Sequence, residues 1–155
     1  MTDANLKYSN EIPIWKFVFL SFVTFGIYDL CWMYKQWKFF KVKDDLKIRP
    51  LWRAIFGPIF IFNLFDRIEK FTSEHGATTK YPYAVLALLW VVANTLVVEL
   101  PDPYWLISML SFVAFIQPVK AMNLYWNKTQ QGLPYELVSW WEALLIILVV
   151  IFSTL

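Results

Sequence analysis

Four long apolar stretches dominate this chain and constrain its fold more than any other feature. They run over residues 14–33, 82–100, 103–120 and 140–155. Each has about 16–20 residues, close to the length of helix that spans a hydrocarbon core. Because 59% of the 155 residues are hydrophobic and 20% are aromatic, a soluble domain of this size would have too little polar surface to cover its core. The sequence therefore predicts a single all-α integral membrane domain, residues 1–155, with four transmembrane helices.

The ends of these stretches carry residues that begin helices or favour the membrane interface. Pro13, Pro82 and Pro103 lie where helices should start. Ser139 and Glu142 have the spacing of a capping box before the last stretch. Tryptophan and tyrosine residues cluster at the ends of the stretches, which predicts an interfacial aromatic belt. These residues are Trp15, Trp32, Tyr34, Trp37, Tyr81, Tyr83, Tyr104, Trp105, Tyr125, Trp126, Trp140 and Trp141.

The distribution of charge orients the predicted helices. Seven basic residues lie from Lys35 to Arg53, against two acidic ones, and three further basic residues follow before residue 81. The turn at residues 99–103 carries only acidic charges. By the positive-inside rule, residues 35–81 and 120–128 are cytoplasmic and the turn is outside. This predicts a multi-pass protein of the inner (plasma) membrane with both termini outside the cytoplasm. The polar N-terminus lacks the basic region of a signal peptide, so the first helix is expected to be retained.

The stretch at residues 51–68 is apolar but differs from the four predicted spans. It starts and ends among cytoplasmic charges, so it should cross the membrane an even number of times or not at all. Its uncharged part, about 12 residues, reaches only about 18 Å as a helix. Gly57 permits a bend, and Pro58 removes a backbone donor. We expect a kinked interfacial or re-entrant helix within a cytoplasmic region, residues 35–81; a full fifth span is the alternative.

A short sequence echo favours two related halves. The letters SFVTF, beginning at Ser21, recur as SFVAF, beginning at Ser111. The repeat would relate residues 14–68 to residues 104–155. Chance recurrence in an aromatic-rich chain is the alternative. If the repeat is real, the first spans of the two halves are parallel.

Parallel helices would place Asp29 and Lys120 at similar depths near the cytoplasmic edge of the membrane. Asp29 lies eight residues after Ser21, and Lys120 lies nine residues after Ser111. An ionised group at that depth is costly unless it is paired. We therefore expect an interhelical pair between Asp29 and Lys120. The alternatives are that Asp29 already lies among the headgroups, or that it handles protons or ions.

Other polar residues are candidates for contacts to helices or lipid. Gln117 lies within a predicted span, where amides commonly hydrogen-bond neighbouring helices. Asn63 is placed either to bond carbonyls freed by the predicted bend or to face a cavity. Lys35, Lys38 and Lys41 are interleaved with aromatic residues. On a helix that leaves a membrane we expect them to contact anionic lipid headgroups, at about 1 kcal/mol per residue, rather than nucleic acid.

No motif in the sequence points to catalysis. The single histidine, His75, has no neighbouring cysteine or paired acid, so no metal site is expected. The single cysteine, Cys31, lacks the base that nucleophilic catalysis needs. We therefore expect no enzymatic activity and no cofactor. The favoured function is a non-enzymatic accessory or scaffold protein that binds lipid, a membrane protein or a second copy of itself. A small channel or transporter that uses residues 51–68 and Asp29 is the alternative.

The segment FVFLSFVTFGIYDLCWMYKQWK, residues 17–38, resembles uncharacterised bacterial inner-membrane proteins. The residues that carry the resemblance are Thr24, Phe25, Gly26, Ile27, Tyr28, Trp32, Tyr34 and Lys35. The resemblance implies a small bacterial multi-span protein of unknown function and transfers no catalytic residue. In such a helix Gly26 would mark a close contact with another helix.

Overall fold

We describe residues 8–76, 80–99 and 101–154 of a computed structural model of the chain. These residues form α1 (Ile14–Val23), α2 (Ile27–Lys43), α3 (Pro50–Ile55), α4 (Gly57–Glu74), α5 (Tyr83–Glu99), the 3₁₀ helix η2 (Tyr104–Phe115), α6 (Ile116–Thr129) and α7 (Trp140–Thr154). The described part of the chain has no strand, so the prediction of an all-α fold is confirmed. Within the same residues, no helix combines the length and the apolar character needed to cross a membrane.

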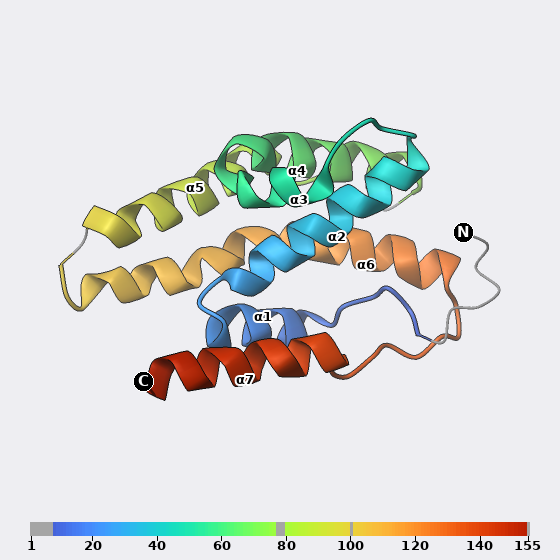
Figure 1. Cartoon of the computed structure of the whole chain (residues 1–155). Coiled ribbons are helices and arrows are strands. Elements are labelled where there is room, and N and C mark those ends of the chain that lie inside the picture. Colours follow the sequence, from blue (N-terminus) through green and yellow to red (C-terminus); the bar gives the residue numbers. More distant parts are fainter. Residues whose placement is uncertain (1–7, 77–79, 100, 155) are drawn as a thin grey trace.

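The first predicted span is two helices rather than one. After α1 the chain turns at Thr24–Gly26, and α2 runs back in the opposite general direction (Figure 1). Phe25 and Gly26 have φ values of 52° and 84°, a left-handed conformation that glycine adopts without strain. The Gly26 amide donates to the Ser21 carbonyl over 2.9 Å, which ends α1. The prediction of one continuous helix over residues 14–33 is therefore wrong, and Gly26 makes a turn rather than a helix contact.

The stretch 51–68 also forms parts of two helices, and it breaks at Phe56, directly before the glycine–proline pair. Phe56 separates α3 from α4, and Pro58 lies in the first turn of α4, where its missing N–H costs nothing. A Cβ atom placed on Gly57 would lie 2.9 Å from Cη2 of Trp90, which belongs to α5. Gly57 therefore serves the close packing of α4 against α5, a role that the sequence did not predict.

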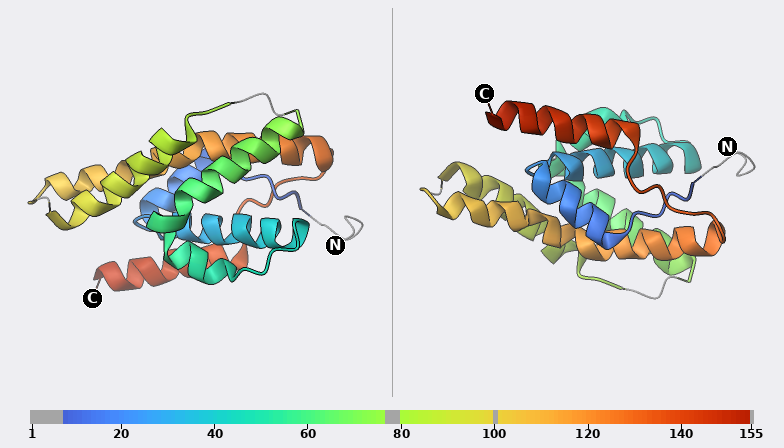
Figure 2. Two further views of the ribbon diagram at one scale, coloured as in Figure 1. Left: turned by 90° about the horizontal axis from the view of Figure 1, so that it is seen from above. Right: turned by 90° about the horizontal axis from the view of Figure 1, so that it is seen from below.

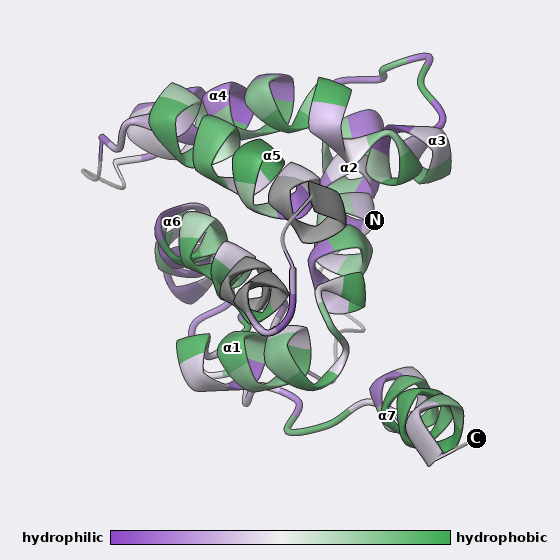
Figure 3. Ribbon diagram, turned by 90° about the vertical axis from the view of Figure 1, so that its left-hand side faces the viewer, coloured by the Kyte–Doolittle hydropathy of each residue, from purple (hydrophilic) through white to green (hydrophobic). Residues whose placement is uncertain are grey.

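The helices gather charged residues at one end of the molecule and apolar residues at the other. The carboxyl ends of α2, α4 and α6 lie at the right-hand end of Figure 1, whereas the α5–η2 turn and the carboxyl end of α7 lie at the left. Figure 2 shows the same separation from above and below. Viewed from the apolar end, α1, α5 and α7 are mainly hydrophobic (Figure 3). The basic segments thus share one end, opposite the turn, which is the grouping that the charge pattern predicts.

The described N-terminal segment lies at the charged end. The Ser9 hydroxyl donates to Oε1 of Gln130 over 3.0 Å, and the Ile12 amide donates to Oδ1 of Asn123 over 3.0 Å. Both partners belong to the carboxyl half of α6 or follow it directly. This segment lies opposite the carboxyl end of α7 (Figure 1). The two ends of the chain themselves, residues 1–7 and 155, lie outside the described residues, so the prediction that both termini are outside the cytoplasm stays a prediction.

Aromatic side chains fill much of the core. The largest fully buried aromatic residues are Phe17, Tyr28, Trp37, Phe40, Phe65 and Phe115. The Phe115 ring makes edge contacts with Trp32, Phe65 and Trp90, at centroid distances of 5.6, 5.2 and 5.9 Å. Such pairs contribute about 0.5–1.5 kcal/mol each beyond the area they bury. The ring of Phe115 thus joins α2, α4 and α5 to the end of η2.

Some aromatic residues of the predicted interfacial belt are buried in the core, and others are exposed. Trp32, Trp37 and Tyr81 are buried and belong to the core, so their assignment to an interfacial belt is wrong. Trp15 and Trp140 are 56% and 76% exposed. The side chains of Tyr104 and Trp105 lie outside the described part of the structure. The sequence could not separate these groups because a tryptophan at the end of an apolar stretch suits either place.

We expect Gly57→Ala to destabilise the protein by about 1–3 kcal/mol, because the added methyl group overlaps the packed Trp90 ring. Denaturant unfolding of the purified variant measures this change. Combining Gly57→Ala with Trp90→Phe, which removes Cη2, should cost less than the sum of the two single changes. Equal costs of Gly57→Ala in both backgrounds would contradict the steric explanation.

Candidate functional site: a basic groove beside a buried ion pair

A groove of about 830 Å³ opens between the N-terminal segment, α2, α6 and the segment that joins α6 to α7. Four residues of α2 line one wall of the groove: Lys35, Lys38, Phe39 and Val42. Their spacing of three or four residues places them on one face of the helix. The other walls carry Glu11, Trp126 and Glu136, and the groove reaches Lys16 and Glu142. Cationic, anionic and aromatic side chains therefore share one opening.

A buried ion pair lies beside this groove. Nζ of Lys16, on α1, is 2.9 Å from Oε2 of Glu142, on α7, and the two side chains are 6% and 2% exposed. The Tyr28 hydroxyl donates to Oε1 of Glu142 over 2.8 Å, and the Ser139 amide donates to Oε2 over 2.8 Å. Lys16 also donates to the carbonyl of Glu136 over 2.8 Å. Each charge is therefore hydrogen-bonded, as a buried ion pair requires.

The contact between Ser139 and Glu142 is half of the predicted capping box. The glutamate reaches back to the N-cap amide, as predicted, but Oγ of Ser139 is buried without a hydrogen-bond partner among the described residues. The carboxylate of Glu142 thus caps the start of α7, pairs with the ammonium of Lys16 and accepts a hydrogen bond from the hydroxyl of Tyr28.

Lys35 lies near this pair on α2 and forms no ion pair with any residue that the structure describes. The rings of Tyr28 and Trp141 are stacked at 5.9 Å, and Nζ of Lys35 lies 4.4 Å from the Trp141 ring centroid. Burial lowers the pKa of Lys35, although its side chain reaches solvent, while the negative charge of Glu142 acts in the opposite direction. Lys35 thus brings a positive charge to the wall of the groove.

Asp29 occupies a different, closed site at the start of α2. The Ser21 hydroxyl donates to its Oδ1 over 2.6 Å, and Nε1 of Trp90 donates to its Oδ2 over 3.4 Å. Asp29 is fully buried, whereas Lys120 is exposed and forms no ion pair with any described residue. The structure does not form the predicted pair. Asp29 instead connects α1, α2 and α5.

The other predicted site residues are separate from Asp29. Asn63 and Gln117 are exposed, and neither side chain makes a hydrogen bond to the described part of the chain. Of the three lysines predicted to meet headgroups, Lys35 and Lys38 line the groove, and Lys41 is exposed outside it. No described cavity joins Asn63 to Asp29.

Sequence reasoning missed Lys16 and Glu142 as site residues. The signal was present, since the apolar stretches 14–33 and 140–155 contain these two opposite charges near their starts. An ionised group in an apolar stretch needs a partner, so the two charges were candidates for one another. The short repeat instead predicted a pair between Asp29 and Lys120.

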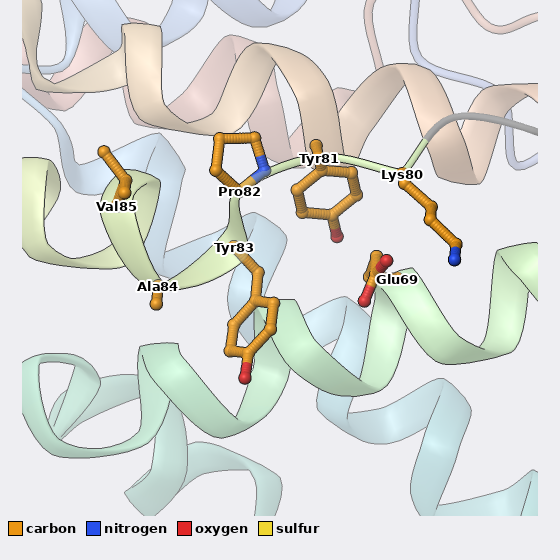
Figure 4. Close-up of a pocket in the computed structure, with 7 residues that line it drawn as sticks. All are labelled: Glu69, Lys80, Tyr81, Pro82, Tyr83, Ala84 and Val85. Carbon is orange, nitrogen blue, oxygen red and sulfur yellow. The ribbon is translucent and has the colours of Figure 1, made fainter.

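A second, shallower hollow of about 470 Å³ lies at the start of α5 (Figure 4). The side chains of Glu69, Lys80 and Tyr81 surround part of it. The Tyr81 hydroxyl donates to the Phe65 carbonyl over 2.9 Å, and burial raises its pKa. Its proton is therefore committed to the fold, which makes this hollow a poor site for acid–base chemistry. The described residues contain no cluster of metal-binding side chains.

We expect Asp29→Asn to lower the free energy of unfolding by about 1–3 kcal/mol, because one of two buried donors loses its acceptor. Lys120→Met should add to this effect independently, within about 0.5 kcal/mol. Unfolding curves of both single variants and the double variant test this. Recovery of stability in the double variant would show that the two residues interact.

Lys16→Met should destabilise the protein by about 3–5 kcal/mol, because it leaves the carboxylate of Glu142 buried without its counter-charge. The double variant Lys16→Met, Glu142→Leu should be clearly more stable than the sum of the single effects predicts. The exposed pair of Lys70 and Asp66 is the matched control, and Asp66→Asn should change stability by about 0–1 kcal/mol. Thermal melts of the four variants measure these differences. Additive effects at Lys16 and Glu142 would contradict the ion pair.

Comparison with known proteins reaches only the first part of the chain. Residues 12–43 match a family described as a domain of unknown function, DUF4234. This segment contains α1, the reversing turn and α2, including Lys35 and Lys38 of the groove. No curated protein and no solved structure matches the chain.

Proposed function

We propose that this chain is an integral membrane protein that inserts by its apolar end and acts as a non-enzymatic lipid-binding accessory or scaffold. The observation that carries the proposal is the orientation of α7. Among its described residues only Glu142 is buried. Leu144, Ile147, Leu148 and Phe152 are between 49% and 79% exposed. A helix that turns its charge inward and its apolar side chains outward suits a lipid environment.

The α5–η2 hairpin supports the same proposal. Its exposed side chains include Val85, Leu88, Leu106 and Leu110. Scattered apolar residues are normal on a soluble protein, but a contiguous apolar end of this kind marks a membrane or protein interface. The helical backbone satisfies its own hydrogen bonds, which is what a hydrocarbon environment demands.

The boundary between the two ends has the composition of a membrane interface. The exposed rings of Trp15 and Trp140 stand at the starts of α1 and α7, and Trp52 is exposed on α3. Tryptophan favours the headgroup level, and basic residues favour the cytoplasmic side. In this proposal α3 and the start of α4 lie along the cytoplasmic interface of the inner membrane, with the lysines of α2 above them.

The proposed topology takes account of the turn at Thr24–Gly26. Segments 82–100, 103–120 and 140–155 enter the membrane as the transmembrane helices, and segment 14–33 enters as a hairpin. The 17 residues of α5 extend about 25 Å, slightly less than a hydrocarbon core of about 30 Å. Local thinning of the bilayer accommodates a difference of this size at modest cost.

The structure does not favour a channel or transporter. Both carboxylate oxygens of Asp29 accept hydrogen bonds from the protein, and Asp29 lines neither described cavity. We therefore propose no transport role.

Site-directed labelling tests the insertion. In a Cys31→Ser background, single cysteines at Leu110, Ile151 and Glu74 carry an environment-sensitive fluorophore, with the protein reconstituted into phospholipid vesicles. Labels at Leu110 and Ile151 should be quenched by nitroxides on lipid chains and protected from aqueous iodide. Glu74 is also exposed, but it ends α4 at the charged end and lies outside the groove, so its label should respond to iodide. Equal access of iodide to all three labels would overturn the proposal.

A further inference from the structure

Cation–π contacts fix the guanidinium group of Arg53 among three helices. Arg53 belongs to α3, and its guanidinium carbon lies 4.5 Å from the ring centroid of Trp37, on α2, and 5.1 Å from that of Phe60, on α4. The guanidinium carbon of Arg67, also on α4, lies 5.8 Å from the ring centroid of Phe40. Trp37 and Phe40 are fully buried, so their rings are fixed supports for the two charges.

Arg53 has no anionic partner in this setting. Arg67 pairs with Asp44 over 2.8 Å, whereas Arg53 forms no ion pair and no side-chain hydrogen bond with any residue that the structure describes. Burial lowers the pKa of Arg53, and the positive charge of Arg67 lowers it further. The Arg53 side chain is only half-buried, and each of its nitrogen atoms reaches solvent. Its N–H donors are therefore accessible, and the group that complements them is an anion.

The chain around Arg53 carries positive charge only. Residues 46–65 contain three basic residues, Lys47, Arg49 and Arg53, and no acidic one. Lys47 and Arg49 are exposed, and neither forms an ion pair within the described part of the chain. Basic residues at a membrane surface attract anionic lipids over about one Debye length. The segment is thus complementary to a negatively charged surface.

A continuous apolar patch adjoins these charges. Its side chains are between 46% and 69% exposed, and they belong to Leu51, Trp52, Ile55, Phe56 and Ile59. The rings of Trp52 and Phe56 are stacked at a centroid distance of 5.8 Å. From the charged end of the molecule α3 runs toward the apolar end, and α4 returns (Figure 1). Basic and apolar side chains therefore follow one another in the order that a lipid headgroup and its acyl chains require.

We propose that Arg53 binds the phosphate of an anionic phospholipid, with α3 and the start of α4 seated in the membrane interface. The guanidinium group donates two parallel hydrogen bonds to phosphate oxygens, and Lys47 and Arg49 add attraction to the headgroup. The acyl chains lie against Ile55 and Ile59. This inference deepens the proposed function, on which the membrane setting rests, and adds the class of lipid.

The net charge of the lipid decides recognition at this site. Phosphatidylglycerol and phosphatidylcholine share the phosphate diester, but the choline ammonium cancels its charge. Residues 46–65 offer no carboxylate to that ammonium, and the nearby Asp44 is already paired with Arg67. The two lipids therefore form a matched pair of probes.

The test is calorimetric titration of the full chain, in an uncharged maltoside detergent, with dihexanoyl phosphatidylglycerol and dihexanoyl phosphatidylcholine. We expect the glycerol lipid to bind about tenfold more tightly, as attraction to one or two basic residues predicts, and the preference to shrink at high salt. Arg53→Gln should weaken the glycerol lipid about tenfold. It should weaken the choline lipid less, because one charge fewer repels the ammonium. Arg53→Lys keeps the charge but loses the paired donors, so its affinity should lie between.

A control variant removes the same charge outside the patch. Lys120 is exposed on α6, and Lys120→Gln should leave both titrations unchanged. Thermal melts without lipid show whether each variant folds. If Arg53→Gln does not fold, Arg49→Gln replaces it, and a several-fold loss of glycerol-lipid binding is expected. Equal binding of the two lipids, or an effect of Lys120→Gln as large as that of the arginine variant, would overturn the site.

Deacylated glycerophosphoglycerol and inorganic phosphate separate a lipid from a free phosphate. Both should bind at least about tenfold more weakly than the dihexanoyl lipid, because they bury no apolar surface on the patch. Equal affinity of either one would overturn the lipid site. A preference for phosphatidylglycerol that requires Arg53, in a protein that fails the vesicle-labelling test, would support the lipid site and overturn the insertion. Insertion with equal binding of the two lipids would do the reverse.

Discussion

The carboxylate of Glu142 attaches α7 to the other helices, and the apolar side chains of α7 contribute little to that attachment. This carboxylate pairs with the ammonium of Lys16 and accepts hydrogen bonds from the hydroxyl of Tyr28 and the amide of Ser139. The stacking of Trp141 on Tyr28 completes the contact. A charge fixed inward in this way leaves Leu144, Ile147, Leu148 and Ile151 exposed on the outer side of α7. The apolar surface on which the proposed membrane insertion rests is thus a consequence of a polar interaction.

The attachment in turn depends on the reversal at Thr24–Gly26. Because α2 returns beside α1, Lys16 and Tyr28 both contact the carboxylate of Glu142. Lys35 lies nearby, over the ring of Trp141. The hydrogen bond from Ser21 to Asp29 connects the two helices across the turn, with Trp90 on the other side of the carboxylate. One turn therefore creates both the anchor of α7 and the wall of the groove.

Several features followed from local sequence. Pro13, Pro82, Pro103 and Ser139 each directly precede a helix, because a proline or a cap is favoured at helix starts for reasons within a few residues. The break at Gly57-Pro58 and the grouping of basic segments at one end also followed from composition and charge. Burial of individual tryptophans did not, because a ring at the end of an apolar stretch has no local signal that separates core from interface.

The sequence by itself determined that this protein is helical, very apolar and divided between a basic end and an apolar end. Helix propensity, hydrophobicity and charge act over short distances and can be read residue by residue. Only the tertiary structure decided that residues 14–33 turn back and that Lys16 rather than Lys120 finds a buried carboxylate. These outcomes depend on which helices become neighbours. The local sequence shows that Lys16 and Glu142 each need a partner in an apolar stretch, but it does not say which helices will bring a partner to them.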